Sequence, residues 1–282
     1  FSNLTNLLIS ALFCFIKKEK GRKKMLHKTI HLQENATLVT YILECSEAVN
    51  QGKKRPAVLI CPGGGYARLS VREAEPIAIQ MNAMGFHAFI LHYSCAPAVF
   101  PTPQLEAAKA MILIREQANE WNILEDKVVI AGFSAGGHLA ASIGTFWNQK
   151  FLYQALEVEP EKIRPDGMIL CYPVITSGKY AHRDSFRNLL GEQDKEQELL
   201  EQTSLEKQVT KETPKTFLWH TYEDGSVPLE NTLLFASALR ACQVPMEVHI
   251  YPRGGHGIAL ANEETQSTGD KNTIIPEAQN WI

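Results

Sequence analysis

Short apolar runs alternate with segments of helical length along most of the chain, and this alternation narrows the choice of fold. The runs, each bounded by turn residues, are residues 36–43, 57–61, 86–93, 127–132, 166–173, 215–221 and 246–252. Helix-like segments between them are residues 73–85, 103–121 and 229–243. Strands that alternate with helices build a mostly parallel sheet covered by helices on both faces. The predicted fold class is therefore α/β.

The chain has 282 residues, which is enough for one large α/β domain. We predict a single domain over residues 25–282. Residues 174–213 break the alternation because they are polar, helix-rich and without a convincing strand. Since they lie between two strands, we expect a short helical insertion over one end of the sheet, where loops shape ligand pockets. A solvated helical connector is an equally open interpretation.

One serine directly follows an apolar run and has glycines on both sides. Residues 132–136 read G-F-S-A-G, and the residues after them can form a helix. In a sharp turn from strand into helix the serine is held in a strained conformation, and larger side chains at the two glycine positions would clash. The pattern predicts a nucleophile elbow at Ser134. The alternative is a glycine-rich helix start.

A serine hydroxyl is a weak nucleophile at neutral pH, so it needs a base, which in turn needs an orienting acid. Five histidines follow the serine: His138, His182, His220, His249 and His256. The first lies on the elbow helix and the second in the polar insertion. The third and fourth belong to strands, where we expect buried, hydrogen-bonded side chains. His256 lies in a glycine-rich loop after the last strand, so we predict that it is the base.

The acid is expected after the penultimate strand, because nucleophile, acid and base follow in this order in folds with such an elbow. Two carboxylates stand there, Glu223 and Asp224. Asp224 opens the segment D-G-S-V-P, and a short carboxylate at the end of a strand can reach an imidazole. We predict Asp224 as the acid. Glu223 is the alternative, and we expect it to be solvated.

Three consecutive glycines, Gly63 to Gly65, follow the run of residues 57–61. Glycines let backbone amides approach a ligand without side-chain obstruction. Acyl transfer builds negative charge on the former carbonyl oxygen, which fixed amides stabilise. With the amide of Ala135, this loop is expected to form an oxyanion hole. A flexible turn or a phosphate-binding loop is the alternative, although the further residues of a phosphate loop are missing.

The first 24 residues differ from the rest of the chain. An apolar stretch, residues 7–16, precedes a strongly basic one, residues 17–24. The apolar stretch is shorter than the roughly 20 residues of a membrane helix, and a secretory signal has its positive charges first. We expect residues 1–24 to be an upstream or non-native extension, or else a short membrane-surface anchor. Stable membrane insertion is not expected.

Charge and cysteine content restrict the partners and the compartment. The net charge is −3, which gives no reason to expect a nucleic-acid partner. Residues 1–24 hold six basic residues and one acidic residue, so the charge without them is −8. The six cysteines are scattered without a C-x-x-C pair, which favours a reducing compartment, the cytoplasm. No metal-ligand pattern occurs in the sequence, so we expect neither a metal nor a cofactor.

The segments CPGGGY, GFSAGGHLA, FLWHTYEDGSVP and YPRGGHG together carry a family resemblance. Between about Pro56 and Ile258 the chain resembles the α/β-hydrolase superfamily, in particular the small esterases that are acetylxylan-esterase-like and hormone-sensitive-lipase-like. The resemblance implies an α/β-hydrolase fold. It also implies that the nucleophile, acid and base are Ser134, Asp224 and His256, and that the oxyanion donors are Gly64, Gly65 and Ala135.

The chain departs from these relatives at three places. Pro62 stands where the lipase-like branch has a histidine, and Glu223 takes the place of a first aspartate in the acid segment. Neither change removes a group expected to be catalytic. The chain ends in EAQNWI, so we expect a truncated C-terminal helix.

The leading hypothesis is a serine carboxylesterase that removes short acyl groups, above all acetyl, from sugars or xylo-oligosaccharides through an acyl-enzyme on Ser134. A peptidase or amidase similar to prolyl-peptidase domains is the enzymatic alternative. A ligand-binding module that has kept the fold but lost its activity is the non-enzymatic one. The sequence predicts a small-molecule ester as the partner and does not indicate an oligomeric state.

Overall fold

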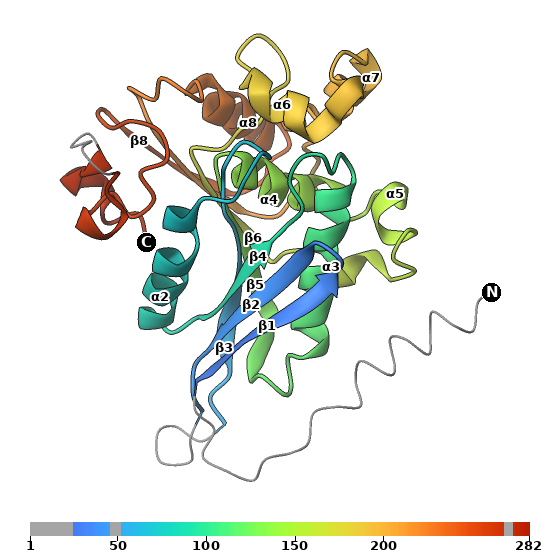
Figure 1. The fold of residues 1–282 in the computed structure, drawn as a ribbon, viewed down its shortest axis with the longest axis vertical. Helices are drawn as coiled ribbons and strands as arrows, with labels where there is room; N and C mark the ends of the chain where they lie inside the picture. Colours follow the sequence, from blue (N-terminus) through green and yellow to red (C-terminus); the bar gives the residue numbers. More distant parts are fainter. Residues whose placement is uncertain (1–24, 46–51, 268–272) are drawn as a thin grey trace.

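The structure is a computed structural model that describes residues 25–45, 52–267 and 273–282. The stretch for which an extension or a membrane-surface anchor is predicted, residues 1–24, lies outside the described residues. An eight-stranded sheet in the order β1-β2-β4-β3-β5-β6-β7-β8 runs through the middle of the molecule (Figure 1). The strands are β1 (Leu26–Gln33), β2 (Ala36–Ile42), β3 (Arg55–Cys61), β4 (His87–His92), β5 (Ile123–Phe133), β6 (Gly167–Cys171), β7 (Thr216–Thr221) and β8 (Met246–Tyr251).

Each neighbouring pair from β4 to β8 is parallel, and only β1–β2 and β2–β4 are antiparallel. The predicted mostly parallel α/β sheet is therefore confirmed. The first strand predicted from the sequence begins at residue 36, whereas in the structure β1 precedes it. Side chains of β1 alternate between exposed and half-buried, because it is an antiparallel edge strand rather than a buried central one.

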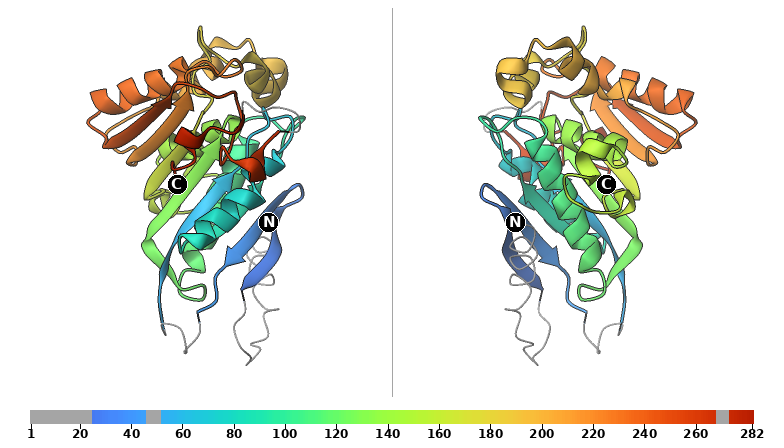
Figure 2. Two further views of the ribbon diagram at one scale, coloured as in Figure 1. Left: turned by 90° about the vertical axis from the view of Figure 1, so that its left-hand side faces the viewer. Right: turned by 90° about the vertical axis from the view of Figure 1, so that its right-hand side faces the viewer.

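Figure 2 shows helices on both faces of the sheet, and an apolar core lies on each face. One core contains side chains from α3 (Thr102–Glu116), α4 (Ala135–Phe146) and α8 (Glu230–Ala241). The other contains side chains from α2 (Glu75–Ala83) and from the segment after β8. Helices therefore cover both faces, as the sequence predicts.

The polar segment 174–213 is helical, as predicted, and holds α6 (Arg183–Leu190), η4 (Gly191–Gln193), α7 (Gln197–Gln202) and η5 (Leu205–Lys207). In Figure 1, α6 and α7 lie beyond the end of the sheet at which α4 begins. The remaining short helices are η2 (Val71–Glu73), α5 (Lys150–Tyr153), η3 (Pro160–Lys162), η6 (Glu263–Thr265) and η8 (Pro276–Ala278).

The helix expected over residues 73–85 is instead a short 3-10 turn, η2, followed by α2. Proline has no amide hydrogen and fits the first turn of a helix, so Pro76 sets the start of α2 at Glu75. Glu73 consequently precedes the helix, and its side chain is buried. The helix expected over residues 103–121 ends earlier, at Glu116.

Cys61 and Cys171 lie inside or at the end of apolar runs of the sequence, which predicts that they are buried. Both are fully buried in the cores, and burial raises the pKa of both thiols. The prediction that His249 is buried is wrong. Its side chain is 43% exposed, because β8 is the last strand of the sheet, and it bonds Glu247.

Candidate active site

Ser134 lies between β5 and α4 in a backbone conformation that L-residues rarely adopt. Its φ is 54° and its ψ is −120°. A Cβ atom at Gly132 would lie 2.2 Å from the carbonyl oxygen of Gly136, and a Cβ atom at Gly136 would lie 2.1 Å from that of Cys61. The two glycines are thus required because strand, helix and the neighbouring strand end meet here. The strained turn expected at Ser134 is present.

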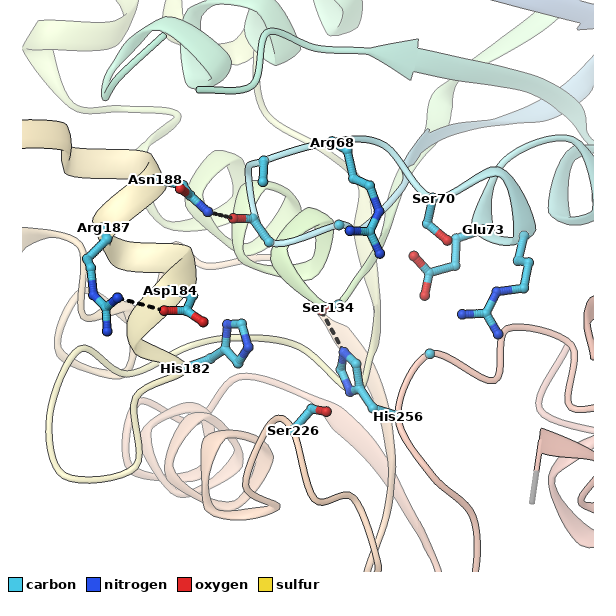
Figure 3. A pocket seen from close by; sticks show the side chains of 15 residues that line it. Arg68, Ser70, Glu73, Ser134, His182, Asp184, Arg187, Asn188, Ser226 and His256 are labelled. Carbon is cyan, nitrogen blue, oxygen red and sulfur yellow. Dashed lines mark hydrogen bonds and ion pairs between the residues drawn. The ribbon is translucent and has the colours of Figure 1, made fainter. Parts of the chain in front are cut away.

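The structure brings Ser134, His256 and Asp224 into one hydrogen-bonded chain. His256 Nε2 lies 2.7 Å from Ser134 Oγ, and His256 Nδ1 lies 2.7 Å from Asp224 Oδ2. Figure 3 marks the bond between His256 and Ser134. The three residues follow the ends of β5, β7 and β8, whose parallel carboxyl ends meet at one edge of the sheet. This is the geometry that nucleophile activation needs.

Asp224 is buried and accepts several hydrogen bonds. Its Oδ1 accepts hydrogen bonds from the amides of Ser226 and Val227, each at 2.9 Å. Its Oδ2 accepts hydrogen bonds from His256 Nδ1 and, at 3.1 Å, from His220 Nε2. Burial alone would raise the pKa of this carboxyl. The hydrogen bonds from His220 and His256 outweigh it and hold the pKa below its usual range. Asp224 therefore stays ionised beside the imidazole.

Glu223 and His220 lie close to Asp224, and the sequence predicted the exposure of Glu223 but not the contact of His220 with Asp224. Glu223 is exposed, as expected of the alternative acid, and only its Oε2 bonds the Gly254 amide at 3.3 Å. His220 is buried and hydrogen-bonded, as expected. Its contact with Asp224 was not foreseen, because His220 belongs to β7 and the chain must turn back for the two to meet.

Of the three glycine amides in the loop after β3, one is hydrogen-bonded to a side chain and two have no acceptor in the described residues. The Gly63 amide donates to Glu73 Oε2 at 2.8 Å. Within the described residues, the amides of Gly64 and Gly65 have no acceptor, and both glycines line the pocket beside Ser134. Their φ values are 126° and 67°, which favour glycine. The amide of Ala135 lies in the first turn of α4, where helical amides have no partner within the helix.

Glu73 links the glycine loop to the histidine loop, and sequence reasoning missed it. Its Oε1 accepts from Tyr172 Oη at 2.8 Å, and the same Oη accepts from the Ala259 amide at 2.9 Å. The Tyr172 ring also packs edge-on against His256, with ring centroids 5.1 Å apart. Burial and the nearby Glu73 raise the pKa of Tyr172. The only available signal was a glutamate near the start of a predicted helix, which gave no reason to expect burial.

A pocket of about 460 Å³ opens beside Ser134. Its wall is made of glycines and polar or charged side chains, and Ala67 contributes the largest purely apolar one. The lining residues are Gly64, Gly65, Ala67, Arg68, Ser70, Arg72, Glu73, Ser134, His182, Asp184, Arg187, Asn188, Ser226, His256 and Gly257. Helix α6 supplies three of them and lies against the glycine loop, because Asn188 Nδ2 bonds the carbonyl oxygen of Gly65 at 2.8 Å.

His182 lines this pocket, although its place in the polar insertion gave no reason to expect it there. It caps α6, and its Nδ1 accepts from the Ser185 amide at 3.3 Å. An amide can only donate, so Nδ1 is unprotonated and the proton of the neutral ring lies on Nε2. Burial and the neighbouring His256 lower the pKa of His182. The ring therefore presents a donor to the pocket wall (Figure 3).

His138 lies on the elbow helix and points away from the pocket, as expected. It is fully buried, with Nδ1 2.9 Å from Tyr66 Oη and Nε2 2.8 Å from the Thr203 carbonyl oxygen. Burial lowers its pKa to about 4. Its neutral ring thus joins the glycine loop, the elbow helix and the end of the polar segment.

The described residues contain no cluster of three or more histidine, cysteine, aspartate or glutamate side chains that could bind a metal ion. None of the helices within them has the length and apolarity to span a bilayer.

Two curated proteins are similar to this chain over most of its length. It is 40% identical over 223 residues to endo-1,4-beta-xylanase B of Butyrivibrio fibrisolvens, covering 76% of this chain and 34% of that protein. It is 32% identical over 209 residues to acetylxylan esterase of Xylanibacter ruminicola, covering 72% and 41%. The chain thus spans between a third and a half of the length of these curated relatives.

A solved structure is similar over nearly its whole length. The acetyl ester-xyloside bifunctional hydrolase from Caldicellulosiruptor lactoaceticus is 39% identical, with a TM-score of 0.75, covering 84% of this chain and 90% of that one. The BD-FAE family model matches residues 43–239. The chain has the α/β-hydrolase fold and belongs to the BD-FAE family.

Proposed function

We propose that the protein is a serine carboxylesterase that removes short acyl groups, above all acetyl, from sugars or xylo-oligosaccharides. The observation that carries this proposal is the hydrogen-bonded chain of Ser134, His256 and Asp224 at the edge of a pocket without large apolar side chains. A serine that is hydrogen-bonded to a base, which is in turn hydrogen-bonded to an acid, supports acyl transfer. No step requires a metal or a cofactor.

In the first step His256 Nε2 takes the proton of Ser134 Oγ while the oxygen attacks the ester carbonyl. The amides of Gly64, Gly65 and Ala135 stabilise the negative charge on the former carbonyl oxygen by donating hydrogen bonds to it. Asp224 holds the imidazole through Nδ1 and stabilises its protonated form. The tetrahedral intermediate then collapses, His256 gives its proton to the departing alcohol oxygen, and the acyl group remains on Ser134.

In the second step water replaces the alcohol. His256 Nε2 takes a proton from the water as it attacks the acyl-enzyme, and the same amides receive the second oxyanion. His256 then returns the proton to Ser134 Oγ, and the carboxylic acid leaves. The second step thus uses the same groups as the first and restores the free enzyme.

The polar pocket supports a short acyl group and a hydroxylated alcohol. A long acyl chain is favoured by apolar walls, because its burial provides the binding energy. Here the wall offers the donors and acceptors of side chains such as Ser70, Asn188 and Ser226, which suit sugar hydroxyls. Relatives named acetylxylan esterase and acetyl ester-xyloside hydrolase support the same substrate class.

We also propose that residues 174–213 act as a cap on a single domain, residues 25–282. The contacts of α6 with the glycine loop and its place in the pocket wall support this over a solvated connector. The cytoplasm remains the predicted compartment. Its support is that Cys61, Cys95, Cys171 and Cys242 form no disulfide within the described residues.

Hydrolysis of p-nitrophenyl esters with acyl chains of two to twelve carbons, by wild type and Ser134→Ala, tests the proposal. We expect the highest kcat/KM on acetate and a fall of about 10⁴–10⁶ in kcat for Ser134→Ala. Acetylated xylose and xylo-oligosaccharides are the next substrates. A preference for long chains would indicate a lipase. A folded wild type without activity on any ester would favour an amidase or an inactive binding module.

A further inference from the structure

We propose that the pocket takes sugar esters that also carry an anionic group, a carboxylate or a phosphate, and that Arg68 and Arg72 bind this group. The inference rests on the proposed esterase function and names the alcohol part of its substrate. The anion belongs to the sugar rather than to the acyl group, because an acetyl group contains no ionisable group.

Arg68 is an exposed cation without a partner within the described residues. It lines the pocket, and Figure 3 shows its guanidinium turned toward the space above Ser134 and His256. Its backbone is held in place, because the Arg68 amide and the Gly64 carbonyl oxygen are hydrogen-bonded at 3.3 Å. The cation is therefore mounted on the same loop that presents the free amides of Gly64 and Gly65.

Arg72 lies on the other side of the same loop. Its Nη1 donates to Ser267 Oγ, and its Nη2 would lie 3.4 Å from a Cβ atom built on Gly257. The guanidinium is thus next to the residue that follows His256. Arginine presents several donors in a planar fork and binds carboxylate and phosphate in two-point contacts.

The pocket lining has one more basic than acidic side chain, since Arg68, Arg72 and Arg187 stand against Glu73 and Asp184. Both oxygens of Glu73 are already used by the Gly63 amide and Tyr172 Oη, and within the described part of the chain no ion pair joins Glu73 to either arginine. The other lining acid, Asp184, pairs with Arg187 at 3.0 Å. Residues 25–282 carry a net charge of −8, so an arginine pair beside the serine is opposite in sign to the protein as a whole.

A positive electrostatic potential in the pocket attracts negatively charged ligands. A neutral sugar ester can accept hydrogen bonds from the two guanidinium groups, but only an anionic one also gains charge attraction, which acts over several ångströms and orients the ligand. Because the protein is acidic overall, the same anion is repelled elsewhere on the surface. The arginine pair therefore favours anionic over neutral esters.

The test compares matched substrates that differ in one group: a methyl O-acetyl-glucoside, the corresponding glucuronoside and the corresponding 6-phosphate. We expect wild-type kcat/KM to favour the anionic esters and this preference to weaken as salt rises. Arg68→Gln and Arg72→Gln should each lower the anionic-to-neutral ratio by about three- to tenfold. Arg68→Lys and Arg72→Lys should restore part of it. Arg240→Gln, on the exposed side of α8, changes the net charge equally and should leave the ratio unchanged.

Binding to Ser134→Ala gives a second readout that does not need catalysis. Calorimetry should detect tighter binding of methyl glucuronoside than of methyl glucoside, and the two arginine substitutions should remove the difference. A glucuronoside preferred to the phosphate identifies a carboxylate, and the reverse identifies a phosphate. Equal kcat/KM and equal binding for charged and neutral sugars would overturn the inference even if acetyl esters are hydrolysed. Loss of ester hydrolysis altogether would instead refute the proposed function.

Discussion

The carboxylate of Glu73 accepts the backbone amide of Gly63 at 2.8 Å, so one amide of the glycine triplet is committed to the protein and two remain for a ligand. The other oxygen of the carboxylate holds Tyr172, which packs against His256. One buried side chain thus ties the loop expected to bind the oxyanion to the loop that carries the base. Glu73 touches no reacting atom and is a positioning residue.

Glu73→Gln should lower kcat by about 10- to 100-fold with little change in KM. An amide has one acceptor instead of two, so it cannot receive both the Gly63 amide and Tyr172 Oη, and the free amides of the loop lose their alignment. Steady-state kinetics on p-nitrophenyl acetate measures the effect. Glu75→Gln is the matched control, because Glu75 lies on α2 outside the pocket lining and accepts a hydrogen bond from Tyr41 Oη. Equal effects of the two substitutions would contradict the role of Glu73.

Asp224→Asn should lower kcat by about 10⁴, because the amide would favour the wrong tautomer of His256 and no longer stabilise its charge. Glu223→Gln should change kcat less than about tenfold, since the Glu223 side chain is exposed. The comparison uses the same ester and a fold check by circular dichroism. A mild effect at Asp224 beside a severe one at Glu223 would reverse the assignment.

Gly136→Ala should destabilise the protein by about 1–3 kcal/mol or more. The added methyl group would lie 2.1 Å from the Cys61 carbonyl oxygen and 2.4 Å from that of Pro62, so β3 and α4 would have to move apart. Urea denaturation measures the loss in the free energy of unfolding. Gly225→Ala is the control, since nothing lies within 4 Å of the new methyl group there. An unchanged midpoint for Gly136→Ala would mean that the elbow is looser than described.

His138 should make the protein less stable as the pH falls from about 6.5 to 4. Burial lowers its pKa from 6.5 to about 4, so in this window the unfolded chain binds a proton that the folded chain does not. The free energy of unfolding is unaffected above pH 6.5 and falls by about 3 kcal/mol across the window. His138→Gln should flatten this dependence in denaturation curves at several pH values. His31→Gln, exposed on β1, should leave it as in the wild type.

Much of the fold was predictable from the chain because its information is local. The buried parts of the central strands β3 and β5, residues 57–61 and 128–133, are continuous apolar runs, since both of their faces are covered. The serine between Gly132 and Gly136 marks an elbow because only glycine fits where strand and helix meet. The order of Ser134, Asp224 and His256 follows the order of the strand ends that carry them.

What stayed hidden depends on contacts between distant segments. Edge position, and not residue type, decides that β1 pairs antiparallel and that His249 is exposed. Three features arise only when loops from different strands meet. They are the burial of Glu73, the hydrogen bond between His220 and Asp224, and the polar pocket wall that includes His182 and Arg68. A sequence reports the chemistry that a side chain can offer, whereas its neighbours, and with them its charge state and access to a ligand, are set by long-range packing.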